Sequence, residues 1–246
     1  MAVLDHEGTY SIMYGRHAVP VGAGYRPGYL SRPDNAGRFP VVVVVPDIDG
    51  LSSHEKDLAR RFARNGIATL TLDLYRDHSG DSIVDYHRLS DRQAATDLDE
   101  VHEFLLSDDV DWAHADAIGM LGLDVGGRFA LAAAVNRSWV NSVAVCYTPL
   151  TGDEDRDWPV GDLLEHLAVP VLGVYGAQDE LIDTVTVDEA QQRNDAGKWL
   201  LYDNAGHGFL NINAEGFDAA AAADAEHRLI EFFLQTLPAA EPRDLG

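Results

Sequence analysis

The sequence predicts an α/β protein with a doubly wound, mostly parallel central sheet that is flanked by helices. Five or six short apolar runs alternate with segments of helical periodicity along the chain. The valine run within Phe39–Pro46 shows no alternation with polar residues, which is typical of a strand buried on both faces. A helical segment joins this run to a second apolar strand, Ile67–Leu72, and such a connection makes the two strands parallel.

Composition favours a globular protein with a sizeable core. The chain has 246 residues, of which 46% are hydrophobic and 24% charged, so we expect one domain spanning residues 1–246. Its net charge of −23 argues against nucleic acid or an anionic membrane as a partner. No apolar run is long enough to span a membrane, and Met1–Glu7 has no signal-peptide pattern. We expect a cytoplasmic monomer or small homo-oligomer that acts on a small molecule.

Cysteine and lysine are both rare. Cys146 is the only cysteine, which excludes an internal disulfide, and its apolar surroundings predict a buried structural thiol. Among the 18 basic residues only Lys56 and Lys198 are lysines. An acidic, lysine-poor composition fits either a salt-rich cytoplasm or a GC-rich genome. In the first case added salt screens the self-repulsion and stabilises the protein.

The elements of the first third follow from local patterns. Within residues 1–38, alternation in Thr9–Tyr14 and His17–Tyr25 predicts an antiparallel strand pair at a sheet edge. After the valine strand, Ser53 is expected to cap a helix that ends at Asn65-Gly66.

The middle of the chain starts with a polar stretch, Asp77–Arg92, which predicts a surface loop. Ala94–Ser107 has apolar residues at helical spacing and is expected to be a crossover helix. The strand Asp116–Leu121 follows, and then an alanine-rich helix over Arg128–Val135. The remaining predicted elements are strands Ser142–Tyr147, Val169–Tyr175 and Lys198–Tyr202, and helices Gly161–Leu167, Thr184–Asn194 and about Glu215–Leu237. Residues 238–246 are expected to form a flexible tail.

The turn Gly122–Gly127, between a strand and a helix, has Asp124 at its apex. A strand that reverses abruptly into a helix needs small residues two before and two after the apex, because the two backbones nearly touch there. Gly122 and Gly126 satisfy this requirement. Such a nucleophile elbow holds its apex side chain above the carboxyl end of the sheet, beside a helix N-terminus.

Several chemically useful residues fall at the carboxyl ends of predicted strands, where ligands bind in doubly wound sheets. They are Asp47, Tyr75, Asp124, Tyr147, Asp179 and His207. An α/β-hydrolase presents its catalytic residues in the chain order nucleophile, acid, histidine. Asp124, Asp179 and His207 follow this order on three successive loops, so we predict an α/β-hydrolase fold with this catalytic triad.

The motifs of this chain resemble those of the dienelactone hydrolase family over nearly its whole length. The matching segments are Pro46–Gly50, Asp73–Tyr75, Gly122–Gly127, Gly176–Asp179 and Ala205–Phe209. The resemblance implies hydrolysis of a small lactone or ester without a metal or organic cofactor. It also implies that Asp179 orients His207 and that His207 acts as the base. The backbone N–H groups of Ile48 and Val125 would form the oxyanion hole.

The chain departs from the family at two positions. Asp124 replaces the elbow thiol, and Asp47 replaces the family's longer Glu. Two close carboxyl groups do not both ionise easily, so we expect one of this pair to have a raised pKa. A carboxylate that attacks a saturated carbon gives an ordinary ester, so an alternative is a dehalogenase or epoxide hydrolase acting through an alkyl-enzyme ester on Asp124. Asp124 could also act as a general base, and a non-catalytic ligand-binding pseudoenzyme is a further alternative.

Asp47, Tyr75, Arg76, Tyr147 and Phe209 are predicted to line the substrate pocket. No tryptophan pair falls at strand ends where halide donors would be expected. Other histidines, including His54, His78 and His87, lack metal-ligand spacing, so no catalytic metal is predicted. Arg128, next to the elbow, is expected to form an ion pair at the surface.

Overall fold

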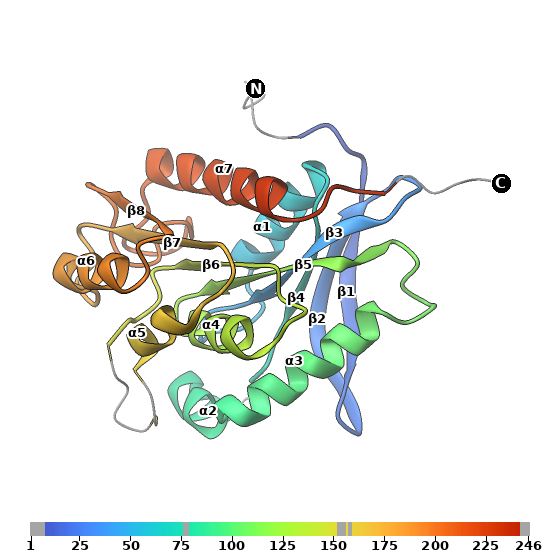
Figure 1. Ribbon diagram of the computed structural model, residues 1–246, viewed down its shortest axis with the longest axis horizontal. Helices are drawn as coiled ribbons and strands as arrows, with labels where there is room; N and C mark the ends of the chain where they lie inside the picture. Colours follow the sequence, from blue (N-terminus) through green and yellow to red (C-terminus); the bar gives the residue numbers. More distant parts are fainter. Residues whose placement is uncertain (1–7, 76–78, 152–155, 157–158, 242–246) are drawn as a thin grey trace.

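A computed structural model describes residues 8–75, 79–151, 156 and 159–241 (Figure 1). Its strands form one sheet in the order β1-β2-β4-β3-β5-β6-β7-β8. Their bounds are β1 Ile12–Val21, β2 Gly24–Pro33, β3 Phe39–Val45, β4 Ala68–Leu72, β5 Ala113–Leu123, β6 Ser142–Cys146, β7 Val171–Gly176 and β8 Lys198–Tyr202. β2 is antiparallel to both of its neighbours, and β3 to β8 are mutually parallel. The predicted α/β class and mostly parallel sheet are confirmed.

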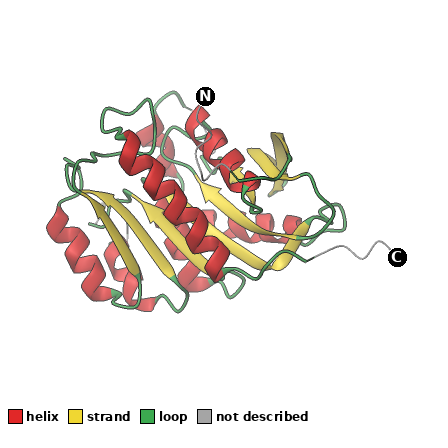
Figure 2. Ribbon diagram, turned by 90° about the horizontal axis from the view of Figure 1, so that it is seen from above, coloured by secondary structure: helices red, strands yellow, loops and turns green. Residues whose placement is uncertain are grey.

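Helices cover both faces of this sheet. They are α1 Ser53–Arg64, α2 Ser82–Arg88, α3 Asp91–Leu105, α4 Gly126–Asn136, α5 Val160–Leu163, α6 Thr184–Arg193 and α7 Ala219–Thr236, with a 3-10 turn at Leu164–His166. α1 and α7 share one face, where Phe62 packs against Phe233, and α3 and α4 lie on the other (Figures 1 and 2). Within the described ranges, no helix is long and apolar enough to cross a membrane.

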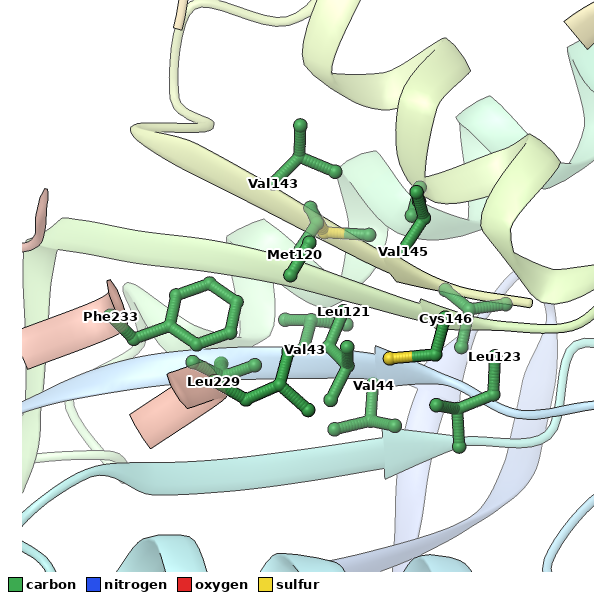
Figure 3. Packing of buried hydrophobic residues seen from close by; sticks show 14 of the residues in the cluster. Val43, Val44, Met120, Leu121, Leu123, Val143, Val145, Cys146, Leu229 and Phe233 are labelled. Carbon is green, nitrogen blue, oxygen red and sulfur yellow. The ribbon is translucent and has the colours of Figure 1, made fainter. Parts of the chain in front are cut away.

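The valine strand β3 lies inside the core, as its composition predicts. All its residues are buried, and Val43 and Val44 pack among Leu121 and Phe233 (Figure 3). Cys146 belongs to the same cluster with no exposed surface, and burial raises the pKa of its thiol above the ordinary range. The predicted structural role of Cys146 is confirmed, because a buried thiol of raised pKa does not ionise readily.

The predicted antiparallel edge pair is present, but the strand limits were wrong. Most of the two predicted segments belongs to the single strand β1, within which Gly15 pairs with Leu30. The chain reverses instead at Gly22, which has φ 65, and Val21 pairs with Gly24. A two-residue turn requires a residue that tolerates positive φ, and Gly22 meets this requirement.

The prediction of a loop over Asp77–Arg92 is wrong for most of its described residues, because α2 and the start of α3 lie in this segment. Asp81 caps α2 by accepting hydrogen bonds from the N–H groups of Ile83 and Val84. Ser90 caps α3 in the same way. The polar residues that suggested a loop therefore begin helices. Residues 76–78 lie outside the described part.

Ser52, and not the predicted Ser53, caps α1. Its side chain accepts a hydrogen bond from the N–H of His54, and its own N–H donates to Glu55 at 2.8 Å. This reciprocal arrangement is a capping box, which the Ser-x-x-Glu spacing encodes. Glu55 is fully buried, and its second oxygen, Oε1, has no hydrogen-bond partner among the residues that the structure describes.

The other limits differ by a few residues. β5 extends beyond the predicted strand at both ends, the predicted helix Gly161–Leu167 is partly a 3-10 turn, and α7 begins at Ala219, after its cap Asp218. Of the predicted flexible tail, the described part reaches Glu241, whose backbone forms a bridge with Arg38. Residues 242–246 lie outside the described part.

Arg128 is not at the surface, in contrast to the sequence prediction. It is 2% exposed and donates to both carboxylate oxygens of Asp91, at 2.8 and 2.6 Å. Arg156 also contacts Asp91, at 3.4 Å, and its guanidinium lies 4.5 Å from the ring centroid of Tyr86. This cluster ties α2 and α3 to α4, next to the elbow.

The elbow has the predicted backbone geometry. Asp124 adopts φ 49, in the left-handed region, and α4 begins two residues later. A Cβ atom on Gly122 would lie 2.2 Å from the Cα of Gly127, and one on Gly126 would lie 2.2 Å from the carbonyl oxygen of Pro46. The strand, the helix and the loop after β3 therefore meet through backbone atoms alone.

Gly122→Ala is expected to lower the free energy of unfolding by about 1–3 kcal/mol or more, because backbone atoms cannot rotate away from the added methyl group. Gly15→Ala is the matched control, since a Cβ on this strand glycine meets nothing within 4 Å. Urea denaturation followed by circular dichroism measures both variants. Equal stabilities would contradict the tight contact.

Candidate active site

Three side chains from separate loops meet at the carboxyl edge of the parallel strands. His207 Nε2 lies 3.3 Å from Asp124 Oδ1, and His207 Nδ1 lies 2.9 Å from Asp179 Oδ2. These residues follow β8, β5 and β7, respectively. The imidazole ring therefore lies between two carboxyl groups, in the order expected of a hydrolytic triad.

Backbone contacts between the loops after β7 and β8 bring Asp179 and His207 together. The N–H of Gln178 donates to the carbonyl of Ala205 at 2.9 Å. A Cβ on Gly176 would lie 2.2 Å from that same carbonyl oxygen, so only glycine fits there. Backbone contacts alone therefore fix the spacing of the two loops.

The two carboxyl groups have different surroundings. The Asp179 side chain is completely buried, and its Oδ1 accepts hydrogen bonds from the N–H groups of Leu181 and Ile182 at 2.9 and 3.1 Å. These bonds fix its orientation. The Asp124 side chain is 17% exposed. A substrate or water can therefore reach the carboxyl group of Asp124, whereas that of Asp179 is enclosed by the protein behind His207.

The protonation state of His207 follows from this arrangement. Burial lowers the pKa of His207, but hydrogen bonds and charge interactions with Asp124 and Asp179 outweigh that effect and raise the pKa to about 9. At neutral pH the ring is therefore mainly an imidazolium. In this form it donates to both carboxylates, so it is better suited to give a proton than to take one.

Asp47 follows β3 and carries the raised carboxyl pKa predicted for one member of the Asp47/Asp124 pair. Burial is the main cause, the charge of Glu55 is the second, and together they raise the pKa of Asp47 to about 7 despite a hydrogen bond from the N–H of Asp49. Asp124 has the smallest of these effects, so the expected direction is confirmed but the main reason is different. Sequence analysis missed Glu55, because its Ser-x-x-Glu spacing indicates a helix cap and not a place beside the site.

Two backbone amides beside the elbow have no acceptor within the described part of the chain. Among the described residues, neither the N–H of Ile48 nor that of Val125 donates a hydrogen bond. Ile48 follows β3 and Val125 precedes α4, where the first amides of a helix point outward. Gly126 holds the helix start against the Pro46 carbonyl, so both amides belong to the same junction.

Aromatic residues predicted for the pocket also lie at this edge. The Tyr147 ring is 5.5 Å from the His207 ring and 6.1 Å from that of Phe209, in edge-on contacts. Tyr147 has φ 41 and shares positive φ with Asp124 alone among the described non-glycine residues. Such strain is typical of functional sites. Arg76, the remaining predicted pocket residue, lies outside the described residues.

Tyr75 is buried, and its hydroxyl donates to the Pro46 carbonyl at 3.4 Å. Burial raises the pKa of Tyr75 and of Tyr147 well above the ordinary value, so both phenols remain protonated donors. Within the part of the chain that the structure describes, no three His, Cys, Asp or Glu side chains converge as a metal-binding group.

Comparison with known proteins places this chain in a family. The sequence matches the model of the dienelactone hydrolase family over residues 27–237. A Methylorubrum extorquens protein named "Putative carboxymethylenebutenolidase" is 30% identical over 240 residues, covering 91% of this chain and 81% of that protein. A Bradyrhizobium protein named "Probable 2-oxo-3-(5-oxofuran-2-ylidene)propanoate lactonase" is 29% identical over 215 residues, covering 81% and 85%.

A solved structure from Klebsiella pneumoniae subsp. pneumoniae, described as a "Putative Dienelactone Hydrolase", superposes with a TM-score of 0.83 at 26% identity. The match covers 92% of this chain and 99% of that one. The predicted α/β-hydrolase fold and the predicted hydrolase class are therefore confirmed, and the chain belongs to the dienelactone hydrolase family.

Proposed function

We propose that this protein hydrolyses a small lactone or ester at the Asp124–His207–Asp179 site. The observation that carries the proposal is an imidazole held between two carboxyl groups, one of which occupies the elbow apex. The names of two relatives, a butenolidase and a lactonase, support the substrate class. The retained family motifs at residues 46–50 and 205–209 support the same assignment.

The carboxylate at the apex changes the expected mechanism. If Asp124 attacked an ester carbonyl, the product would be an anhydride, which is a poor intermediate. Asp124 instead takes a proton from a water molecule, and that water attacks the carbonyl carbon. The N–H groups of Ile48 and Val125 stabilise the negative charge that develops on the carbonyl oxygen.

His207 then acts as the acid. As the tetrahedral intermediate collapses, the ester C–O bond breaks and the His207 imidazolium donates its Nε2 proton to the leaving oxygen. The proton taken up by Asp124 returns to Nε2 across the 3.3 Å contact, which restores the starting state. Asp179 holds the ring in place and stabilises its charge throughout. This assigns His207 a role as acid, where the family resemblance implied a base.

A second candidate keeps Asp124 as a covalent nucleophile on an organohalide or epoxide. Alkylation of Asp124 removes its charge, and with it one of the two carboxylates that raise the His207 pKa. The pKa of His207 would then fall, and the ring, neutral near pH 7, could accept a proton from water in the second step. The protonated hydroxyl of Tyr147 favours an epoxide, whose oxygen needs a donor as the ring opens.

Asp124→Asn is expected to reduce turnover of lactones and esters by about 10²–10⁴-fold, the usual contribution of a general base. Asp116→Asn, an exposed carboxylate on the same strand, is the control and should retain activity. Acid release against lactones, esters, haloacids, haloalkanes and epoxides measures both variants. Silence of the wild-type protein across this panel would favour a non-catalytic binding protein.

A single turnover in ¹⁸O-labelled water distinguishes the two catalytic candidates. Water attack on the carbonyl places the label in the product acid and none in Asp124. Hydrolysis of an alkyl-enzyme ester instead places the label in the Asp124 carboxylate, where peptide mass spectrometry detects it. Label in Asp124 would contradict the proposed general-base mechanism.

The pH dependence of kcat/KM tests the role of His207. An acid with a pKa of about 9 predicts a rate that is constant near neutrality and falls as the pH rises through about 9. A rate that instead increases through this range would identify His207 as a base. Asp179→Asn removes one stabilising carboxylate and should move the falling limb to lower pH.

The His207 pKa itself is accessible to NMR titration of the imidazole ring. Asp124→Asn is expected to lower it from about 9, because one of the two stabilising charges is lost. Folding raises this pKa, so the stabilisation from the charged ring is complete below about pH 6.5 and is lost as the pH rises through about 9. A His207→Gln variant should lack this pH-dependent part of the stability. An unchanged His207 pKa in Asp124→Asn would contradict the direct contact.

A further inference from the structure

Backbone hydrogen bonds hold Tyr147 beside the catalytic groups. Its own N–H donates to the carbonyl of Val174 on β7 at 2.8 Å. The N–H of Asp124 donates to the carbonyl of Cys146, the residue before Tyr147, at 3.0 Å. The ring of Tyr147 lies edge-on to the ring of His207, with 5.5 Å between their centroids. The position of this phenol relative to the elbow and the imidazole is therefore set by the ends of the parallel strands.

Tyr147 is almost completely enclosed, yet its hydroxyl has no partner. Tyr147 and Phe209 form an aromatic wall next to His207, and only 3% of Tyr147 is exposed. Among the residues that the structure describes, none forms a hydrogen bond with the Tyr147 hydroxyl. Its oxygen is also not one of the unpaired polar atoms that the described part of the chain seals from solvent. Part of the small accessible area of Tyr147 therefore belongs to the hydroxyl.

Other buried tyrosines use their hydroxyl groups inside the protein. Tyr75 donates to the Pro46 carbonyl at 3.4 Å, and Tyr175 donates to the Thr148 carbonyl at 3.3 Å. Such bonds are the rule, because a buried phenol without a partner loses its hydrogen bond to water and gains none in return. Tyr147 differs from both, and it is the tyrosine in contact with the catalytic imidazole. Its hydroxyl is therefore placed to bind an oxygen atom of a ligand.

This hydroxyl can donate a hydrogen bond but does not act as a base. Burial raises the pKa of Tyr147 well above the ordinary value, and charge effects of neighbours that include Asp47 and Asp124 raise it further. The phenol therefore keeps its proton near neutral pH. A fixed O–H donor stabilises an oxygen atom on which negative charge develops.

The order of the strands determines which substrate oxygen lies near this donor. β5 lies between β3 and β6 in the sheet. Ile48 follows β3 and Tyr147 follows β6, so they lie on opposite sides of Asp124. A carbonyl whose oxygen points to the Ile48 N–H directs its other substituents towards the side of His207 and Tyr147. The leaving oxygen, which takes its proton from His207 in the proposed mechanism, is therefore on the same side as the Tyr147 hydroxyl.

We infer that Tyr147 is a further catalytic residue, whose hydroxyl donates a hydrogen bond to the leaving oxygen of the lactone or ester. The inference rests on the proposed hydrolytic function and adds a donor to the same site. As the C–O bond breaks, its electron pair passes to the leaving oxygen. One lone pair of this oxygen takes the Nε2 proton of His207, and another accepts the hydrogen bond from Tyr147. Tyr147 keeps its own proton, so the proton balance of the mechanism is unchanged.

A series of acetate esters that differ only in the leaving alcohol tests this role. The alkoxide of a simple alcohol is a poor leaving group, whereas 4-nitrophenolate leaves without help. Tyr147→Phe should therefore lower kcat/KM for alkyl esters by about 10–100-fold, the range for a hydrogen bond to a charged group. The value for 4-nitrophenyl acetate should hardly change. An equal loss on all esters, or no loss on alkyl esters, would overturn the inference.

Tyr175→Phe is the matched control, because it removes a buried hydroxyl that has a partner, the Thr148 carbonyl. It should lower the melting temperature and leave the dependence on the leaving group as in wild type. Tyr147→Phe should keep or slightly raise the melting temperature, because the hydroxyl that it removes has no partner in the described part of the chain. A decrease as large as that in Tyr175→Phe would identify Tyr147 as a structural residue and contradict the inference.

Binding of a leaving-group anion separates failure of this inference from failure of the proposed function. If wild type hydrolyses none of the esters, the proposed function fails, and calorimetry with 2,4-dinitrophenolate in mildly acidic buffer still tests the donor. The measurement uses Asp124→Asn, in which the apex no longer repels an anion, with and without Tyr147→Phe. Binding that is at least about tenfold weaker in the double variant supports the inference. Equal binding by both proteins, or no binding by Asp124→Asn, overturns it.

Discussion

The arrangement of the site depends on how closely β5 approaches α4. A Cβ on Gly122 or Gly126 would overlap backbone atoms of Gly127 or Pro46, and one on Gly127 would lie 1.9 Å from the hydroxyl oxygen of Thr148. These contacts join the elbow to the loops after β3 and β6. The amide of Ile48, the carboxylate of Asp124 and the ring of Tyr147 are therefore positioned by backbone packing, and the positive φ of the two latter residues is held by that packing.

In the proposed mechanism, the carboxylate at the apex takes its position from this backbone packing and determines the charge around His207. Asp124 remains within reach of His207, but it adds a second carboxylate to a ring that already faces Asp179. The pKa of His207 consequently rises to about 9 despite burial. The proposed role of His207 as the acid follows from this charge, whereas its position follows from the backbone.

Sequence analysis succeeded where the signal was local. The Gly-rich elbow, the valine strand and the chain order of Asp124, Asp179 and His207 are each visible in a short window. It failed where tertiary contacts determine the local structure, the burial of a side chain or a pKa. Asp81 and Ser90 looked like loop residues and are helix caps. An alanine-rich helix does not reveal which face is buried, so Arg128 was placed at the surface. The pKa of Asp47 depends mainly on burial and on Glu55, eight residues away, which no motif connected to the site.

The backbone also determines how the proposed substrate is positioned. The reacting carbonyl must be oriented at the catalytic groups themselves. In the proposed mechanism the Ile48 and Val125 amides perform this task, and the aromatic wall supplies contact area. Binding then concentrates on the carbonyl oxygen, where negative charge develops, so the contacts that select the substrate also stabilise its transition state.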